Sequence, residues 1–165
     1  MMQKQPRSTS PLKTILALNL AALAALAATK LPAQAQGKGM LFQLAHTPVA
    51  EVEGSHTLVP GKGGGYDFLQ YTPTKTGDAI TFTVRMTEPG YYRVQTTSYK
   101  DGAEGIYSLE IDGQEISRKD FYQSNVWEVG QFEVKPGIYQ VTYRCVGKNP
   151  KSSGIGVQLG NLHFR

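Results

Sequence analysis

Apolar and polar side chains alternate along most of the chain after residue 48. The alternating apolar positions include Ile80, Phe82 and Val84; Tyr107, Leu109 and Ile111; Tyr139, Val141, Tyr143 and Cys145; and Ile155, Val157 and Leu159. A period of two residues is typical of strands that bury one face and expose the other. No segment after residue 36 keeps a 3.6-residue apolar period over more than two turns. The pattern therefore predicts roughly eight to ten strands and no long helix.

Turns and register breaks mark the limits of these predicted strands. Asp112 and Gly113 predict a two-residue hairpin turn, because both residues tolerate the positive φ that such a turn needs. The apolar parity shifts at Gly130 and again at Gly160, which predicts a β-bulge at each glycine. This series of short strands favours an all-β antiparallel β-sandwich, with a jelly roll as the expected topology.

The first 35 residues have the order of a secretory signal peptide. Lys4, Arg7 and Lys13 precede an apolar run over residues 14–28, and a small-x-small pattern ends at Ala35. The alternative is a membrane anchor, but this run is shorter than the roughly 20 residues that a spanning helix needs. We therefore expect cleavage after Ala35 and a secreted or periplasmic protein with no membrane contact afterwards.

This cleavage defines the expected organisation of the chain. Residues 36–47 form an entry segment with a short apolar patch, expected to lie against the body as a strand or a single turn. Residues 48–165 form the predicted β-sandwich domain. About 130 residues remain after residues 1–35 are removed, which is enough for one domain with a core of its own.

Removal of the same segment changes the charge of the chain. With the three basic residues named above, Lys30 accounts for four of the 17 Lys and Arg residues, and no Asp or Glu is lost. Thirteen basic residues then stand against 13 acidic residues, so the mature chain is formally neutral. No basic run remains to contact phosphates, which argues against a nucleic-acid partner.

Residues that would support catalysis are sparse. The nucleophile motif Gly-x-Ser-x-Gly is absent, and His46, His56 and His163 have no metal-binding spacing. Cys145, the only cysteine, shares a predicted strand face with apolar residues, which favours a buried and unreactive thiol. We expect a non-catalytic protein without a cofactor and keep a small hydrolase as the less favoured alternative.

A polar loop between the last two predicted strands carries a compact set of hydrogen-bonding groups. These groups belong to Lys148, Asn149, Ser152 and Ser153. Such donors and acceptors suit a ligand rich in hydroxyl groups. Asn and Ser side chains also commonly cap their own turns, and the pattern alone favours neither interpretation.

Three aromatic residues lie at or near the ends of predicted strands, beside polar loops. They are Tyr99, Tyr122 and Trp127. An aromatic ring in such a position can stack on the apolar face of a sugar. For Trp127 the alternative, packing in the core, is slightly favoured.

Several segments occur in an order that is known from one fold. They are Val49-Ala-Glu51-Val-Glu53, Gly77-Asp78-Ala-Ile80, Gly90-Tyr-Tyr92-Arg-Val94, Leu109-Glu-Ile111-Asp112-Gly113, Gly137-Ile-Tyr139 and Gly147-Lys-Asn149-Pro-Lys-Ser152-Ser-Gly154. In this order they resemble the galactose-binding-like jelly-roll domain of family 6 and family 35 carbohydrate-binding modules. They are also similar to the sandwich domain of DUF2961-type secreted proteins. The resemblance covers residues 48–165.

The resemblance implies a secreted, non-catalytic module that binds a glycan or polysaccharide. In such modules, loop aromatics and an Asn of the last long loop bind the ligand. Asn149 corresponds to that Asn, and Tyr99, Tyr122 and Trp127 correspond approximately to the aromatics. The alternative is a structural or assembly domain that associates with itself or with another secreted protein.

The resembling modules often hold a structural calcium ion between acidic residues of the first and last strands. Glu51 and Glu53 correspond to the acidic residues of the first strand. Gly160 stands where the last strand would supply an Asp. Calcium takes six to eight oxygen ligands, and one carboxylate is missing here. We therefore expect weak or absent calcium binding.

Overall fold

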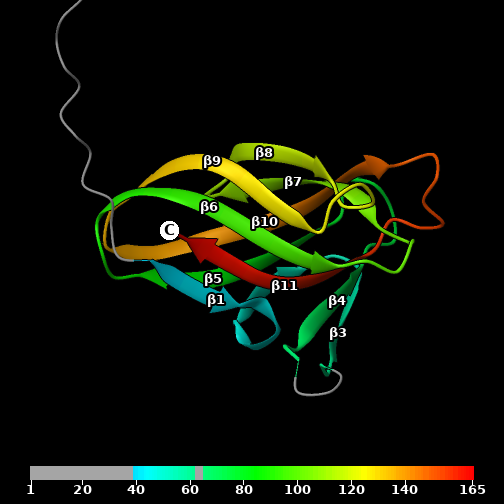
Figure 1. The fold of residues 1–165 in the computed structure, drawn as a ribbon, viewed down its shortest axis with the longest axis horizontal. Coiled ribbons are helices and arrows are strands. Elements are labelled where there is room, and N and C mark those ends of the chain that lie inside the picture. The colour runs from blue at the N-terminus through cyan, green and yellow to red at the C-terminus, as the bar shows by residue number, and fades with distance from the viewer. Residues whose placement is uncertain (1–38, 62–64) are drawn as a thin grey trace, which may run out of the picture. The chain divides into compact units, whose positions relative to one another are not determined.

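A computed structural model describes residues 39–61 and 65–165, which form two antiparallel β-sheets packed face to face (Figure 1). The first sheet contains β1 (Met40–Gln43), β3 (Ser55–Val59), β4 (Phe68–Thr72), β6 (Gly90–Tyr99), β9 (Val126–Val134) and β11 (Val157–Phe164). The second contains β2 (Val49–Val52), β5 (Ala79–Met86), β7 (Gly105–Ile111), β8 (Gln114–Asp120) and β10 (Gly137–Lys148). The predicted antiparallel β-sandwich is confirmed.

Strands that are distant in sequence become neighbours in both sheets. The order in the first sheet is β3-β4-β11-β6-β9, and β1 also pairs with β11. The order in the second sheet is β2-β5-β10-β7-β8. The last strand of the chain therefore lies between β4 and β6, so side chains of these three strands share one outer surface.

The core lies between the sheets and is built from the faces that the alternation predicted. Phe82 of β5 and Tyr143 and Cys145 of β10 are fully buried there. Phe82 and Tyr143 meet edge to face with ring centroids 6.1 Å apart. The full burial of Cys145 confirms the expected buried cysteine, and this burial raises the pKa of the Cys145 thiol.

The predicted turn and bulges are present. Asp112 and Gly113 have φ values of 48° and 78° and join β7 to β8. The pairing of β6 with β9 shifts beside Gly130, which has a φ of 110°. The pairing of β11 with β6 shifts between Leu159 and Leu162, at the bulge expected for Gly160.

The described part of the predicted entry segment, residues 39–47, is part of the sandwich. Residues of β1 pair with β11, and the 3-10 helix η3 (Leu44–His46) follows with Leu44 fully buried. The sandwich therefore begins before residue 48. The predicted signal peptide, residues 1–35, lies outside the described residues. In the described part of the chain, no helix has the length and apolar character needed to cross a membrane.

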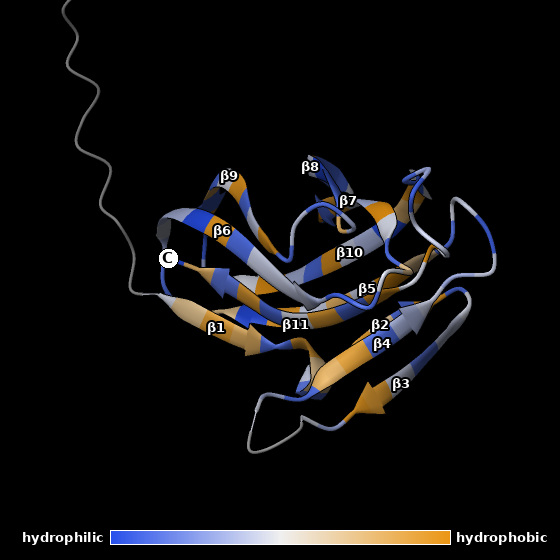
Figure 2. Ribbon diagram, turned by 45° about the vertical axis from the view of Figure 1, so that its right-hand side comes forward, coloured by the Kyte–Doolittle hydropathy of each residue, from blue (hydrophilic) through white to orange (hydrophobic). Residues whose placement is uncertain are grey.

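The β3-β4 hairpin forms one edge of the first sheet and carries much apolar sequence (Figure 2). Tyr71 of β4 is buried and donates its hydroxyl hydrogen to the Glu53 carbonyl at 2.6 Å. This bond ties the hairpin to the corner between β2 and β3. Burial is the main cause of the raised pKa of Tyr71, so this phenol remains a donor at neutral pH.

Candidate functional site

Asn149, a predicted ligand residue, forms hydrogen bonds within the protein through both ends of its amide. Its nitrogen donates to the Asp120 carboxylate at 2.5 Å, and its oxygen accepts the Lys151 backbone N–H at 2.9 Å. Asp120 also accepts the backbone N–H of Tyr122 at 3.1 Å. Asn149 therefore joins the loop after β10 to the turn after β8.

The two predicted serines hold the same loop against the segment after β6. Ser152 is 5% exposed, and its hydroxyl donates to the Gly154 carbonyl at 3.0 Å. The Ser153 hydroxyl donates to the Gly102 carbonyl at 3.0 Å. Lys148 is exposed at the end of β10. These contacts support the interpretation of a loop that caps itself.

Trp127 is a core residue, which corrects its assignment as a ligand residue. Its side chain is 4% exposed, and its ring packs against Phe121 with centroids 3.7 Å apart. The ring face is therefore not available to a sugar. Tyr122 is partly buried, and the ammonium nitrogen of Lys100 lies 5.5 Å from its ring centroid.

Tyr99 alone among the predicted aromatics presents a widely exposed ring. Its side chain is 55% exposed on the outer surface of the first sheet. It packs against Phe68 of β4, with centroids 5.6 Å apart and ring planes at 56°. The two rings form a tilted corner above β11, the strand between them.

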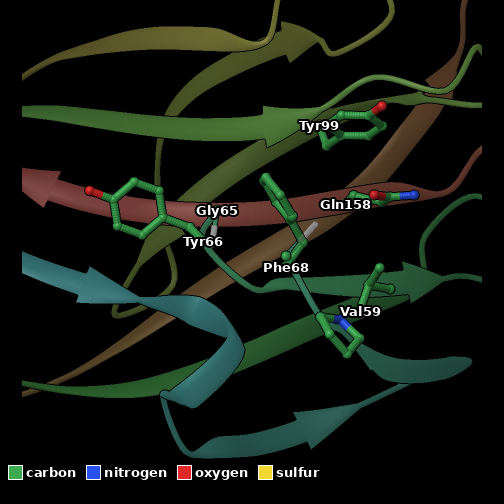
Figure 3. A pocket seen from close by; sticks show the side chains of 8 residues that line it. Val59, Gly65, Tyr66, Phe68, Tyr99 and Gln158 are labelled. Atoms are coloured by element: carbon green, nitrogen blue, oxygen red, sulfur yellow. The ribbon is translucent and has the colours of Figure 1, made fainter. Parts of the chain in front are cut away.

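This aromatic corner is part of an open pocket of about 400 Å³, here called the Tyr99 pocket (Figure 3). Its lining residues are Val59, Pro60, Gly61, Gly65, Tyr66, Phe68, Tyr99 and Gln158. Tyr66 is 64% exposed and lies on the other side of Phe68 from Tyr99 in Figure 3. Gln158 supplies the amide of this lining.

The strand register explains why these residues meet. Gln158 of β11 lies opposite Gln70 of β4 on one side and opposite Tyr99 of β6 on the other. Val59 of β3 lies opposite Phe68. Side chains opposite each other in neighbouring strands point to the same face, so all of these residues line the outer surface.

Gly160 gives the Phe68 ring room to lie over β11. A Cβ atom at Gly160 would stand 2.7 Å from the Thr97 hydroxyl oxygen and 3.2 Å from the Phe68 ring. Both distances are shorter than an ordinary carbon contact. Gly160 therefore serves the packing of the pocket wall as well as the bulge.

Sequence reasoning missed Phe68, Tyr66 and Gln158 as candidate site residues. One signal was available for Phe68. Leu69 and Tyr71 carry the core parity of their strand, so the alternation directs Phe68 outward. An outward aromatic residue indicates a binding surface when other apolar residues gather beside it in one patch.

Glu51 and Glu53, which correspond to calcium ligands of the resembling modules, form no cluster with a third carboxylate among the residues that the structure describes. Glu53, just after β2, accepts the backbone N–H of Ala79 at 3.2 Å, and both Glu53 and Glu51 of β2 are exposed. The third position, Gly160, has no room for a carboxylate beside Thr97. Within residues 39–61 and 65–165, no group of three His, Cys, Asp or Glu side chains is placed to hold a metal ion.

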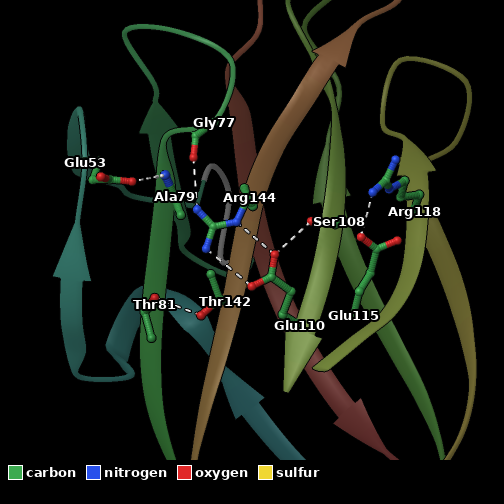
Figure 4. Close-up of polar contacts among 10 residues, drawn as sticks. All are labelled: Glu53, Gly77, Ala79, Thr81, Ser108, Glu110, Glu115, Arg118, Thr142 and Arg144. Carbon is green, nitrogen blue, oxygen red and sulfur yellow. Dashed lines mark hydrogen bonds and ion pairs between the residues drawn. The ribbon is translucent and has the colours of Figure 1, made fainter. Parts of the chain in front are cut away.

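The outer surface of the second sheet differs from the Tyr99 pocket, because its polar groups are paired with each other (Figure 4). Arg144 forms an ion pair with Glu110 at 2.9 Å and donates to the Gly77 carbonyl at 3.0 Å. The Glu110 carboxylate raises the pKa of the Arg144 guanidinium. The hydroxyls of Thr81 and Thr142 are 2.8 Å apart. We therefore assign the candidate site to the first sheet.

No protein-family model and no curated protein sequence matches this chain. Similarity appears among solved structures. A Paenibacillus xanthan lyase is 24% identical with a TM-score of 0.70; the match covers 75% of this chain but 13% of the lyase. A family 35 carbohydrate-binding module from Clostridium thermocellum is 13% identical with a TM-score of 0.53, covering 77% of this chain and 97% of the module.

A further similar structure is the C-terminal family 6 module of a laminarinase from Zobellia galactanivorans. It is 13% identical with a TM-score of 0.51, and the match covers 78% of this chain and the whole module. At identities this low, the structural matches establish a shared fold alone. The chain therefore has the galactose-binding-like β-sandwich fold that is found in family 6 and family 35 carbohydrate-binding modules.

Proposed function

We propose that this protein binds a carbohydrate and that the Tyr99 pocket is its ligand site. The observation that carries the proposal is the corner of the exposed Tyr99 ring and the half-buried Phe68 ring beside the amide of Gln158. A sugar ring has an apolar face, which stacks on an aromatic ring, and hydroxyl groups, which need directional partners. The pocket offers both kinds of contact.

The fold supports the same proposal. The similar modules from Clostridium thermocellum and Zobellia galactanivorans are described as carbohydrate-binding. Our chain matches nearly the full length of each, so the domain corresponds in extent to a complete module.

The lining of the pocket favours binding over catalysis. Among its described residues, none is an Asp, Glu, His, Cys, Ser or Lys. The usual nucleophiles and general bases are therefore missing from this set. We propose a non-catalytic role in a secreted or periplasmic protein, the location that the N-terminal pattern predicts.

A glycan array followed by titration calorimetry on the purified protein tests this function. Replacing Tyr99 with Ala removes a stacking ring, which is worth about 0.5–1.5 kcal/mol, so the affinity for a bound glycan should fall roughly three- to tenfold. Phe68→Ala should act in the same direction. Tyr122→Ala is the matched control, because that ring lies outside the pocket lining.

Two results would contradict the proposal. Equal affinities for the wild-type protein and Tyr99→Ala would move the glycan site elsewhere, and a loss in Tyr122→Ala would return it to the predicted loop edge. Absence of any glycan hit would favour the assembly alternative, for which sedimentation at increasing concentration would show a dimer.

A further inference from the structure

We propose that Asp101 fixes the orientation of the Gln158 amide, so that the pocket selects a ligand group that donates a hydrogen bond. The inference rests on the proposed carbohydrate site and specifies what that site recognises. It makes Asp101 a positioning residue, which acts on the ligand through Gln158.

The first step concerns the direction of one hydrogen bond. The Gln158 amide nitrogen donates to one carboxylate oxygen of Asp101 at 3.2 Å. An ionised carboxylate accepts hydrogen bonds and donates none, so the nitrogen is the end of the amide that belongs beside Asp101. The amide oxygen is then the end left for the pocket, which Gln158 lines. Gln158 therefore presents its amide oxygen, a hydrogen-bond acceptor, to a ligand in the pocket.

The second step is that Asp101 is itself held in place. Its other carboxylate oxygen accepts the Ala103 backbone N–H at 2.9 Å. Its backbone N–H and that of Gly102 both donate to one oxygen of Glu104, a side chain that is 1% exposed. Each oxygen of the Asp101 carboxylate thus has a fixed partner, and a buried side chain anchors its backbone.

The third step is the class of ligand group. An amide oxygen pairs with the hydrogen of a sugar hydroxyl, whereas a carboxylate or sulfate oxygen has no hydrogen to give. The negative charge of Asp101 behind the amide also disfavours an anionic group there. The group that contacts Gln158 is therefore a neutral hydroxyl rather than a uronate or sulfate group.

A pair of reciprocal substitutions tests this orientation. In Asp101→Asn the new amide can either donate or accept, so Gln158 is free to turn its nitrogen towards the ligand. Gln158→Glu places two carboxylates in contact. In the double variant, the amide introduced at position 101 donates to one oxygen of the carboxylate introduced at position 158, and the other oxygen again faces the pocket as an acceptor. The double variant keeps the charge of the wild-type pair.

Titration calorimetry with cellohexaose, laminarihexaose, mannohexaose and xylohexaose measures the effect. For the hexaose that binds the wild-type protein most tightly, each single variant should lose affinity roughly three- to tenfold, and the double variant should recover most of it. A double variant no better than the single variants would overturn the selection of a donor group. So would tighter binding of polygalacturonate than of every neutral hexaose.

The amide resonances of Gln158 give a readout that needs no ligand. In the wild-type protein one side-chain N–H of Gln158 should show slow hydrogen exchange and a shift away from free glutamine, and Asp101→Asn should change both. Asp120→Asn is the matched control, because Asp120 also accepts a backbone N–H and a Gln amide but does not contact Gln158.

The two measurements separate the possible failures. If the Gln158 resonances resemble free glutamine in the wild-type protein, the positioning role of Asp101 is wrong even if glycans bind. If the amide is held but no hexaose or array glycan binds, the proposed function is wrong, while the contact between Asp101 and Gln158 stands. Thermal unfolding of every variant checks that its fold is retained.

Discussion

Phe68 and Tyr99 contact each other across a strand that lies between their own. Neighbouring strands are about 4.8 Å apart, so side chains of β4 and β6 meet only if those of β11 leave space. Gly160 supplies that space, and the two ring centroids lie 5.6 Å apart. The aromatic corner of the pocket thus depends on a residue that has no side chain.

Gly160→Ala should therefore destabilise the fold and weaken any ligand bound at the pocket. The added methyl group meets the Thr97 hydroxyl and the Phe68 ring, and overpacking of this kind costs about 1–3 kcal/mol. Urea unfolding measures the free energy. Gly137→Ala is the control, because its Cβ would meet nothing closer than 3.8 Å. Equal losses in both variants would contradict the steric explanation.

Asn149→Ala should lower stability while leaving glycan affinity unchanged. The substitution removes a hydrogen bond to the Asp120 carboxylate, and bonds to charged groups contribute about 1.5–3 kcal/mol. Denaturant titration and calorimetry with the same glycan measure the two effects separately. Lost affinity in a variant with wild-type stability would instead support the predicted role of Asn149 in binding.

Stability should fall at alkaline pH because a buried tyrosine must ionise on unfolding. Burial raises the pKa of Tyr143 above its ordinary value, and its hydroxyl lies 2.8 Å from that of Thr96. The folded state then holds this proton more tightly than the unfolded state. The stabilisation is complete below about pH 10 and is lost as the pH rises further.

Urea unfolding between pH 8 and pH 11 measures this dependence. Tyr143→Phe should be less stable by about 1 kcal/mol at pH 8, since it loses the bond to Thr96, but should lose less stability as the pH rises. The same pH dependence in both proteins would assign the effect to other groups.

A calcium chelator should leave the thermal midpoint unchanged. Glu51 and Glu53 supply two carboxylates, whereas calcium needs six to eight oxygen ligands. Any calcium should therefore bind with a dissociation constant in the millimolar range or weaker. Differential scanning calorimetry with a chelator, and then with added calcium, measures the effect. A midpoint that drops with the chelator and recovers with calcium would show that our assessment of the site is wrong.

The sequence by itself determined the features that depend on neighbouring residues. Alternation assigned Phe82 and Cys145 to the core, because successive side chains of a strand point to opposite faces. Asp112-Gly113 determined a tight turn through its tolerance of positive φ, and parity shifts located the bulges at Gly130 and Gly160.

Only the tertiary structure decided which of these local elements meet. Alternation gives the face of a residue but not the neighbouring strand, so it directs Phe68 outward without showing that Tyr99 lies beside it. Trp127 became a core residue because Phe121, from the loop before its strand, packs on its ring. The Asn149 amide donates a hydrogen bond to Asp120, which lies at the end of another strand. Contacts between distant segments depend on strand order and loop path, which are set by packing the whole chain around one core.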